Sequence, residues 1–422
     1  MAKKLTAWGA SLAVLALVVA AVTPLHGARQ RSPPRLVSAA RGEGPLSAGA
    51  AAVPLEVAPG TTLAGFPRLQ WASLGVRDAP MARAVVLAEP GFTSALVSAD
   101  ILLVPRALRR AVEARLADLH LQALVLTATH THSGPGGYWQ DTLGELFGTG
   151  PYDAGALESL AGRVEEAVRR AAAARVPARL QVARATLTGL SYNRDGGEVD
   201  GRLLVLRATR GDGAVVAEVV VFPAHATIVD RKSRLISADW PGALARQLPG
   251  ITVVLQGAVG DQTWRLEPGV EEAPEGYARL LAEAVRGLRF GEGDERPPLG
   301  EATAEVALPA PSFAAVPRLF DRLLSNLLWS FMPERATVTA LRLGPSLLLA
   351  VPGEPVAEVG RRWRDALGEG SEVVSLAGDY LGYVETPERV RARSGEAKRT
   401  YLGPDLAYVL GDGLVAAGEA LR

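Results

Sequence analysis

Two histidines separated by a single residue stand out in a chain with only 5 histidines. His130 and His132 lie in the stretch TATHTHSGPGG (127–137), after the apolar run LQALVL and before a glycine-rich turn. The run is typical of a strand, and side chains at positions i and i+2 of a strand share a face. We therefore expect the two imidazoles to project together. The pair is either part of a metal site or a buried polar pair at a strand end.

Other polar side chains also follow apolar runs that predict strands. His225 ends VVVFPAH, Asp261 follows TVVLQGAVG, and Glu354 follows LLLAVPG directly before a predicted helix. Tyr380 and Tyr383 follow the run VVSLAG. Loops that leave one edge of a sheet are where such folds assemble their sites. We expect these side chains to converge with the two histidines on one pocket, although Asp261 is equally suited to capping a turn.

Imidazoles combined with a carboxylate suit one particular kind of metal site. They leave open positions on zinc, as in hydrolytic rather than structural sites. Bound zinc lowers the pKa of its water to ~7, which provides hydroxide at neutral pH. The chain has no cysteine, so His, Asp, Glu or Tyr must bind any metal. The same nitrogen and oxygen ligands accept other divalent ions as well.

The elements that must position these residues are short β-branched runs that alternate with helical runs from about residue 53 onward. The pattern predicts strands at 82–89, 94–100, 121–130, 201–208, 215–225, 251–261, 346–354 and 372–380. Helical periodicity covers 106–119, 154–174, 276–288 and 355–367. The alternation predicts an α/β or mixed α+β fold, a single large catalytic domain on one buried mixed sheet.

Composition and the N-terminus narrow the class of protein. The chain has 45 basic and 45 acidic residues, which argues against a nucleic-acid partner bound through bulk charge. Lys3 and Lys4 precede an apolar run from Ala7 to Val22, the layout of an export signal. We predict a signal peptide or membrane anchor at 1–27, a flexible Pro-, Ser-, Gly- and Ala-rich linker at 28–52, and a hydrolase domain at 53–422. The protein is then exported, to the periplasm, the exterior or the membrane surface.

The candidate residues lie within longer motifs that occur in a fixed order. They are GVRDAPMARAVVL (75–87), ALVSAD (95–100), ATHTHSGPGGYW (128–139), SYNRDGGEVD (191–200), VFPAHATIVDRKSRLISADWPG (221–242), GAVGDQTW (257–264), AVPGEPVAEVGRR (350–362) and DYLGYVETPE (379–388). Together they resemble the neutral, non-lysosomal ceramidases over about residues 53–405. The resemblance implies a zinc-dependent amidohydrolase that cuts the N-acyl bond of ceramide into fatty acid and sphingosine.

The resemblance also implies roles for individual residues. It makes His130, His225, Glu354 and Tyr383 the zinc ligands, with Tyr380 as the alternative tyrosine. His132 would contact the substrate or the attacking water, and Arg194 would line the polar end of the substrate. We expect Asp239, in the SADW motif, to be either a structural acid or an acid that supports a residue of the site.

The chain departs from the family pattern at three places. Thr263 stands where the family has a serine once assigned as nucleophile, and Trp264 replaces a proline. Gly395 aligns with a second family tyrosine, for which Tyr401 is the nearest replacement. A C-terminal immunoglobulin-like domain is expected to be absent. These departures leave two alternatives open: a zinc hydrolase for a different amide or ester, and a catalytically silent lipid-binding protein.

The stretch VPRLFDRLLSNLLWSFMPE (316–334) has a broad apolar face at helical spacing. It is either a buried helix or a lid or membrane-facing helix beside a lipid pocket. The expected partners are a small lipid-like substrate and a membrane surface, and no protein partner is inferred.

Overall fold

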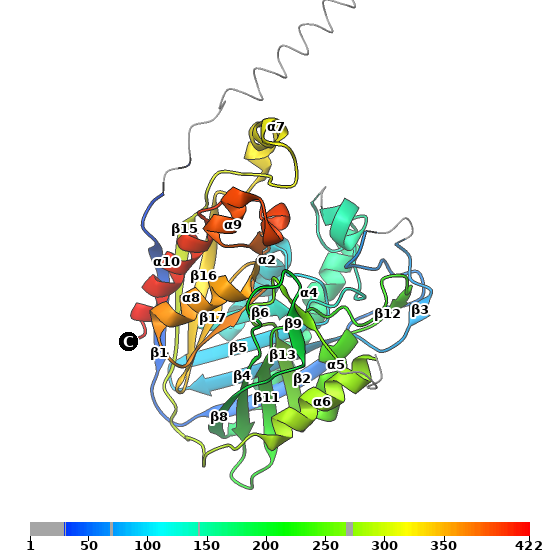
Figure 1. Ribbon diagram of the computed structural model, residues 1–422. Coiled ribbons are helices and arrows are strands. Elements are labelled where there is room, and N and C mark those ends of the chain that lie inside the picture. Colours follow the sequence, from blue (N-terminus) through cyan, green and yellow to red (C-terminus); the bar gives the residue numbers. More distant parts are fainter. Residues whose placement is uncertain (1–28, 30, 68–70, 142–143, 267–272) are drawn as a thin grey trace, which may run out of the picture.

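The structure is a computed structural model that describes residues 29, 31–67, 71–141, 144–266 and 273–422 (Figure 1). The predicted signal peptide or anchor at 1–27 lies outside these residues. Within the described ranges, none of the helices combines the length and the apolar character needed to span a bilayer.

Most of the described strands belong to three larger sheets. The first has the order β6 (Ala123–Ala128), β5 (Phe92–Ala99), β4 (Met81–Glu89), β2 (Ser47–Pro54) and β7 (Val176–Pro177). The second has the order β13 (Ile251–Leu255), β11 (Val215–Val221), β10 (Arg202–Thr209) and β8 (Arg179–Thr186). The third has the order β1 (Arg35–Gly42), β15 (Leu299–Ala307), β16 (Arg335–Leu343), β17 (Ser346–Ala350) and β19 (Ser371–Val374).

Short strand pairs and helices complete the described chain. The pairs are β3 (Gly75–Val76) with β12 (Leu235–Ile236), β9 (Ser191–Asn193) with β14 (Gln262–Trp264), and β18 (Glu354–Pro355) with β20 (Tyr383–Val384). The α-helices are α2 (Arg106–Arg115), α4 (Ala154–Ala173), α5 (Asp239–Gln247), α6 (Pro274–Gly287), α7 (Arg318–Leu328), α8 (Ala357–Leu367), α9 (Pro387–Ala392) and α10 (Leu406–Glu419). Shorter helical turns are η1 (Ala117–Leu119), η2 (Glu145–Thr149), η3 (Trp329–Phe331) and η4 (Gly395–Arg399).

The three sheets share one apolar core. Leu96 of β5, Leu206 of β10 and Leu341 of β16 belong to the same buried cluster between the sheets. The outer face of each sheet is covered by helices: α2 and α4 on the first, α5 and α6 on the second, and α8 and α10 on the third. Sheets buried on both faces need continuous apolar strands, which explains the unbroken runs in the sequence.

Parallel pairing brings the ends of five strands toward the same region. Strands β5 and β6, β11 and β13, and β17 and β19 pair in parallel. Isolated bridges then connect the sheets, one between Thr127 and Ala377 and another between Thr131 and Ala226. The segments that follow β6, β11, β13, β17 and β19 therefore leave the core close to one another.

The mixed α/β fold and the predicted helices at 106–119, 154–174, 276–288 and 355–367 are confirmed. The single buried sheet is corrected to several sheets, because the strands pair in three larger groups.

The flexible linker predicted at 28–52 is wrong for most of its length. Residues 35–42 form β1, paired with β15, and residues 47–54 form β2, paired with β4. The small residues of this segment reflect close packing. A Cβ at Gly49 would lie 2.2 Å from the carbonyl oxygen of Ala171, so α4 approaches β2 too closely for a larger side chain.

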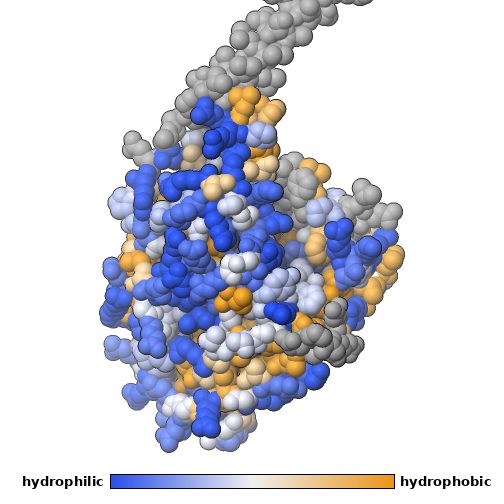
Figure 2. All heavy atoms as spheres, viewed as in Figure 1, coloured by the Kyte–Doolittle hydropathy of each residue, from blue (hydrophilic) through white to orange (hydrophobic). Residues whose placement is uncertain are grey.

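The buried alternative for 316–334 is also wrong. None of the residues of α7 or η3 is buried. Figure 1 shows α7 standing away from the body, and Figure 2 shows hydrophobic residues there above a mostly hydrophilic surface.

Candidate metal centre and active site

His130 is held in an unusual backbone conformation directly after β6. The strand ends at Ala128, and His130 has φ 66°, in the left-handed region. Its Nδ1 lies 2.7 Å from the carbonyl oxygen of Leu102, which can only accept a hydrogen bond. Nδ1 therefore carries the proton and Nε2 is free to bind a ligand. The two histidines were predicted to project together because both would lie in a strand. That reason is wrong, because His130 lies beyond the end of β6 and its left-handed backbone conformation sets the direction of the ring.

His225 repeats this arrangement on the second sheet. It follows β11, and its Nδ1 lies 2.8 Å from the carbonyl oxygen of Gln262. Burial lowers the pKa of His225 to about 4, so the ring is neutral at pH 7. With the proton on Nδ1, the Nε2 atom presents a lone pair to the site.

Glu354, on β18, faces both histidines. Its Oε2 lies 3.2 Å from Nε2 of His130 and 3.2 Å from Nε2 of His225. Its Oε1 accepts a hydrogen bond from the hydroxyl of Tyr380 at 2.7 Å. Burial raises the pKa of Glu354, but the two facing imidazoles outweigh burial and keep the pKa well below its usual value. Glu354 is therefore an ionised carboxylate.

Tyr383 completes the cluster from the neighbouring strand β20, where it pairs with Glu354. Its hydroxyl lies 3.0 Å from Nε2 of His225 and accepts a hydrogen bond from Nη2 of Arg194 at 3.1 Å. Burial raises the pKa of Tyr383 well above its usual value, and the charge of Glu354 raises it further. The hydroxyl stays protonated unless a cation is bound beside it.

The donor atoms of this cluster fit a divalent cation. Oε2 of Glu354 is buried and receives no hydrogen bond from any described residue. Both imidazole Nε2 atoms lie 3.2 Å from that oxygen, an approach that is favourable when a proton or another cation lies between them. The ring nitrogens of His130, His132 and His225 also lie within 4.8 Å of one another. Nitrogen and carboxylate donors in this arrangement are typical of catalytic metal sites.

His132 lies at the edge of the cluster. Its Nε2 is 3.3 Å from Nε2 of His130, and its backbone N–H donates to the carbonyl of Ala226 at 3.1 Å. Burial lowers the pKa of His132 well below its usual value, so the ring is neutral. Its Nδ1 is buried and forms no hydrogen bond with a described residue. His132 therefore has a ring nitrogen available for a proton.

Arg194 is held beside Tyr383 by two further contacts. Its Nε donates to Glu396 at 2.6 Å, and its Nη2 donates to the carbonyl of Gly260 at 2.7 Å. Burial lowers the pKa of Arg194, but its interactions with Tyr383 and Glu396 outweigh burial and leave the pKa raised. The site thus contains a permanent cation.

Asp261 and Asp239 serve the scaffold. Asp261 accepts the backbone N–H of Ala357 at 2.9 Å, at the start of α8, and the side-chain amide of Asn193 at 2.5 Å. Asp239 accepts the backbone N–H of Val229 at 2.8 Å. These contacts favour a structural role for both aspartates.

The side chains of the remaining two candidates, Thr263 and Tyr401, form no hydrogen bond with the cluster. Thr263 pairs with His225 through a backbone bridge, but no described residue forms a hydrogen bond with its hydroxyl. A hydroxyl nucleophile needs an adjacent base, and none is bonded to Thr263. Tyr401 packs on the loop before Tyr383, where a Cβ at Gly382 would lie 2.7 Å from its ring. The described residues likewise offer no hydrogen bond to the Tyr401 hydroxyl.

Sequence reasoning missed the groups that orient these side chains. The carbonyls of Leu102 and Gln262 carry no signal in the sequence, because any residue supplies a carbonyl. Glu396 was missed because it is 202 residues from Arg194 along the chain.

The comparisons with known proteins agree with one another. The family described as neutral/alkaline non-lysosomal ceramidase, N-terminal, matches residues 55–248. A neutral ceramidase of Mycobacterium tuberculosis is 24% identical over 78% of this chain and 68% of its own length. Over residues 55–248, this chain therefore matches the neutral/alkaline non-lysosomal ceramidase family.

Further comparisons place its fold among the neutral ceramidases. A neutral ceramidase of Pseudomonas aeruginosa is 26% identical over 42% of this chain and 29% of its own length. The crystal structure of a Pseudomonas aeruginosa neutral ceramidase matches with a TM-score of 0.75 at 20% identity, over 90% of this chain and 74% of that one. A ceramidase complexed with C2 matches with a TM-score of 0.74 at 19% identity, over 90% and 75% of the two chains.

The region matched by the ceramidase family contains His130, His132, Arg194 and His225. Glu354 and Tyr383 lie beyond residue 248, and the fold brings them to the same cluster.

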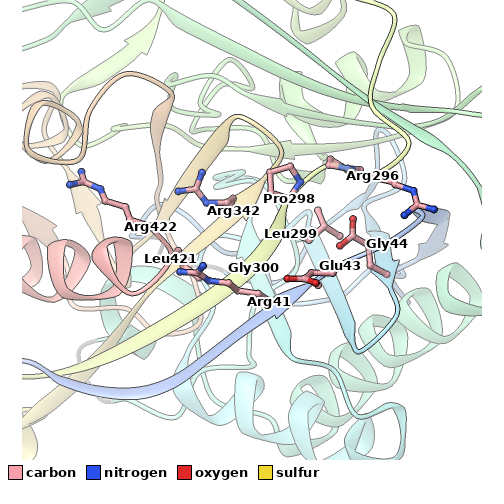
Figure 3. Close-up of a pocket in the computed structure, with 13 residues that line it drawn as sticks. Arg41, Glu43, Gly44, Arg296, Pro298, Leu299, Gly300, Arg342, Leu421 and Arg422 are labelled. Atoms are coloured by element: carbon pink, nitrogen blue, oxygen red, sulfur yellow. The ribbon is translucent and has the colours of Figure 1, made fainter.

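A separate cleft of about 630 Å³ lies away from the cluster (Figure 3). Arg41, Glu43, Glu89, Arg342 and Arg422 are among its lining residues, and none of the three clustered imidazoles is. Its size alone therefore does not make it the active site.

Proposed function

We propose that this chain is a metal-dependent amidohydrolase that cuts the N-acyl amide bond of ceramide or a related N-acyl lipid into fatty acid and amine. The observation that carries the proposal is the convergence of two imidazole Nε2 atoms on the unpaired Oε2 of Glu354. The match to the ceramidase family and the similarity to a neutral ceramidase support the reaction class. The similar fold of a ceramidase complexed with C2 supports a lipid-like substrate.

We further propose zinc as the metal, held by His130, His225, Glu354 and Tyr383. Two imidazole nitrogens, a carboxylate and a phenol oxygen suit zinc, which prefers nitrogen and oxygen ligands when thiolates are absent. When bound, zinc supplies Lewis-acid polarisation of a carbonyl and activation of a water. The hydrogen bonds from the imidazole Nδ1 atoms to Leu102 and Gln262 set the tautomer that such binding requires.

The neighbouring side chains handle charge and protons. Arg194 holds a fixed positive charge beside the Tyr383 hydroxyl, which suits an amide oxygen that becomes negative during attack. His132 is neutral and has an unpartnered Nδ1, so it accepts a proton from a water or passes one to the departing amine. The hydroxyl of Tyr380 stabilises the negative charge of Glu354 by donating a hydrogen bond to it.

We propose export for the protein because its first residues have the layout of an export signal. Lys3 and Lys4 precede the apolar run from Ala7 to Val22. A ceramide-like substrate resides in membranes, which suits an enzyme placed at a membrane surface.

A second candidate is a metal hydrolase of this scaffold that acts on a different amide or an ester. Gly395, which aligns with a family tyrosine, favours it. Gly395 has φ 57°, and a Cβ there would lie 2.4 Å from Oε2 of Glu385. A tyrosine does not fit at this position without a rearrangement, so the groups beside the acyl carbonyl differ from the family pattern.

The test combines metal analysis with a substrate panel. The purified full chain is assayed for bound metals and for hydrolysis of ceramides, N-acyl amino compounds and esters, with and without a chelator. We expect stoichiometric zinc and chelator-sensitive ceramide hydrolysis, both lost in His130→Ala and Glu354→Ala. The control His120→Asn removes a histidine outside the cluster and retains a residue type that tolerates its left-handed φ of 48°.

Each outcome of this test has a distinct meaning. Zinc content that is unchanged in both variants contradicts the metal assignment. Zinc with hydrolysis of another amide or an ester, but no product from ceramide, favours the second candidate. Zinc that is lost in His120→Asn as well points to general unfolding, and circular dichroism of each variant identifies that case.

A further inference from the structure

The helix α7 and the turn η3 form a projecting segment, residues 318–331, that we call the tip. Its large hydrophobic side chains face solvent: Leu319 is 50% exposed, Phe320 53%, Leu327 59% and Phe331 81%. Elsewhere in the described chain, Leu74, Val76 and Leu235 are exposed at the β3–β12 pair, and the other exposed large hydrophobic residues are spread over several elements. A concentration of this kind marks an interaction site, whereas single exposed hydrophobic residues are normal. Figure 2 shows this hydrophobic region at the projecting end of the molecule.

The helix of the tip turns a polar face toward the body and its apolar face toward solvent, the reverse of an ordinary surface helix. Asp321 and Ser325 lie one turn apart on the face that contacts the body. Asp321 accepts the backbone N–H of Phe313 at 2.6 Å and the guanidinium of Arg393 at 2.6 Å. Leu319 and Leu327 therefore lie on the opposite side and point outward. A soluble helix normally buries its apolar face, so this one is built to present it to a partner.

The charges around the tip favour an anionic partner. Arg318 and Arg322 are exposed, and neither forms an ion pair with a residue in the described ranges. The acidic residue of the helix, Asp321, is already neutralised by Arg393. An apolar face bordered by free arginines is the pattern of a helix that lies in the interface of an anionic membrane.

The N-terminal part of the chain joins the body at the same place. Arg29 donates to the carbonyl oxygen of Pro333 at 2.6 Å and of Met332 at 3.2 Å. Its guanidinium also lies 4.9 Å from the centre of the Trp329 ring. The apolar run that ends at Val22 is thus connected to the base of the tip by only a few residues.

The base of the tip is also connected to the candidate active site. The backbone N–H of Ser312 donates to the carbonyl of Tyr401 at 2.9 Å, and the rings of Phe313 and Tyr401 lie 6.2 Å apart. Tyr401 in turn packs on Gly382, next to Tyr383. The tip and the candidate metal site therefore both contact the segment around Gly382 and Tyr401.

We propose that the tip inserts its apolar face into the headgroup and acyl boundary of an anionic lipid membrane and holds the catalytic domain there. The apolar face meets the acyl chains, and the free arginines meet lipid phosphates. Docking does not depend on the proposed activity, so binding and turnover are measured separately.

The test uses the full chain, with the N-terminal run made unable to insert by Leu15→Asp and Val18→Asp. In this background, sedimentation with vesicles of phosphatidylcholine, with and without phosphatidylglycerol, measures binding by the tip. We expect binding that increases with phosphatidylglycerol and decreases with salt. Leu319→Ser, Leu327→Ser and Phe331→Ser combined should weaken it by about a thousandfold, since each buried side chain contributes about tenfold.

A matched control removes exposed apolar groups elsewhere. Leu74→Ser and Leu235→Ser, which are 66% and 39% exposed, should leave vesicle binding unchanged. Hydrolysis of a soluble short-chain substrate should be the same in the tip variant and its parent, which shows that the tip variant is folded.

Three results overturn the proposal. The first is vesicle binding that the tip substitutions leave intact. The second is loss of all binding when the N-terminal run alone is changed, which makes the run the membrane contact. The third is a tip variant that binds vesicles normally but no longer forms a dimer in analytical ultracentrifugation, which makes a second copy of the chain the occupant. A chain that binds vesicles through the tip but hydrolyses nothing supports docking and contradicts only the proposed function.

Discussion

The hydroxyl of Tyr380 donates a hydrogen bond of 2.7 Å to Oε1 of Glu354. This bond occupies one carboxylate oxygen and turns the other toward the two imidazoles. Tyr380 therefore orients the carboxylate, while Tyr383, three residues later, lies beside the imidazole of His225. The two tyrosines that the sequence offered as alternatives have different contacts.

Removal of the Tyr380 hydroxyl should weaken metal binding. In Tyr380→Phe the Glu354 carboxylate loses its partner and rotates more freely, and the loss of such a contact typically costs about 10- to 100-fold in metal affinity. Competition titration with a chromophoric chelator measures the change. Tyr408→Phe, which alters an exposed tyrosine, serves as the control. An unchanged affinity in Tyr380→Phe would show that the hydrogen bond does not orient the ligand.

Glu354→Gln should separate folding from metal binding. Without a metal, the glutamine amide can donate a hydrogen bond to an imidazole lone pair, whereas the carboxylate has no proton to donate. We expect a metal-free Tm at least equal to that of the metal-free parent, together with loss of bound zinc. Differential scanning calorimetry with and without a chelator tests both. A metal-free variant that melts well below the metal-free parent would contradict this account of the cluster.

The parent itself should lose stability when its metal is removed. A ligand that binds only the folded state stabilises it by about 2.7 kcal/mol at 100 times its dissociation constant. Chelation should therefore lower the Tm of the parent, and added zinc should restore it. Glu354→Gln serves as the control, because its Tm should not respond to the chelator. A parent Tm that is insensitive to chelation would argue against a metal in the folded protein.

Glu396→Gln should impair positioning of Arg194 without removing the metal. The Glu396 side chain is 3% exposed and its contact with Arg194 is 2.6 Å, so the substitution leaves a partly buried cation without its charged partner. We expect a loss of about 1–3 kcal/mol in the free energy of unfolding. Chemical denaturation measures this loss, and kcat should fall while zinc content stays at the parent value. Loss of zinc in this variant would show that Arg194 supports the metal rather than the substrate.

Glu89 should make the stability of the protein depend on pH. Burial raises its pKa from 4.5 to about 7, and nearby Asp294 and Glu43 add to the shift. Both of its carboxylate oxygens are buried without a hydrogen-bond partner among the described residues. The folded state therefore binds the proton more tightly than the unfolded state. The resulting stability is fully present below about pH 4.5 and is lost as the pH rises through about 7.

The variant Glu89→Gln removes this dependence. We expect it to be more stable than the parent at pH 8, by about 1–2 kcal/mol after allowance for solvent in the adjoining cleft. Urea denaturation at several pH values measures the difference. Glu292→Gln, at an exposed glutamate, should follow the parent curve. If the free energy of unfolding depends on pH in the same way in the parent and in Glu89→Gln, ionisation of Glu89 does not destabilise the folded state.

Local patterns determined the strands, several helices and the types of residue in the site. Apolar runs such as VVAEVVV predict strands because both faces of the sheets are buried. His130, His225 and Glu354 were found from the sequence because each follows such a run. The low-complexity appearance of residues 28–52 was misleading, since small side chains suit both flexible linkers and tightly packed strands.

The tertiary structure alone decided how these residues are used. Oε2 of Glu354 meets imidazoles that come from 224 and 129 residues earlier in the chain, through loops that no local pattern describes. Periodicity showed that 316–334 has an apolar face, but it did not show which way the face points. That direction depends on contacts such as the one between Asp321 and Arg393, which form only when distant segments fold together. Local sequence encodes the tendency to be a strand or a helix, and long-range packing decides which faces and atoms meet.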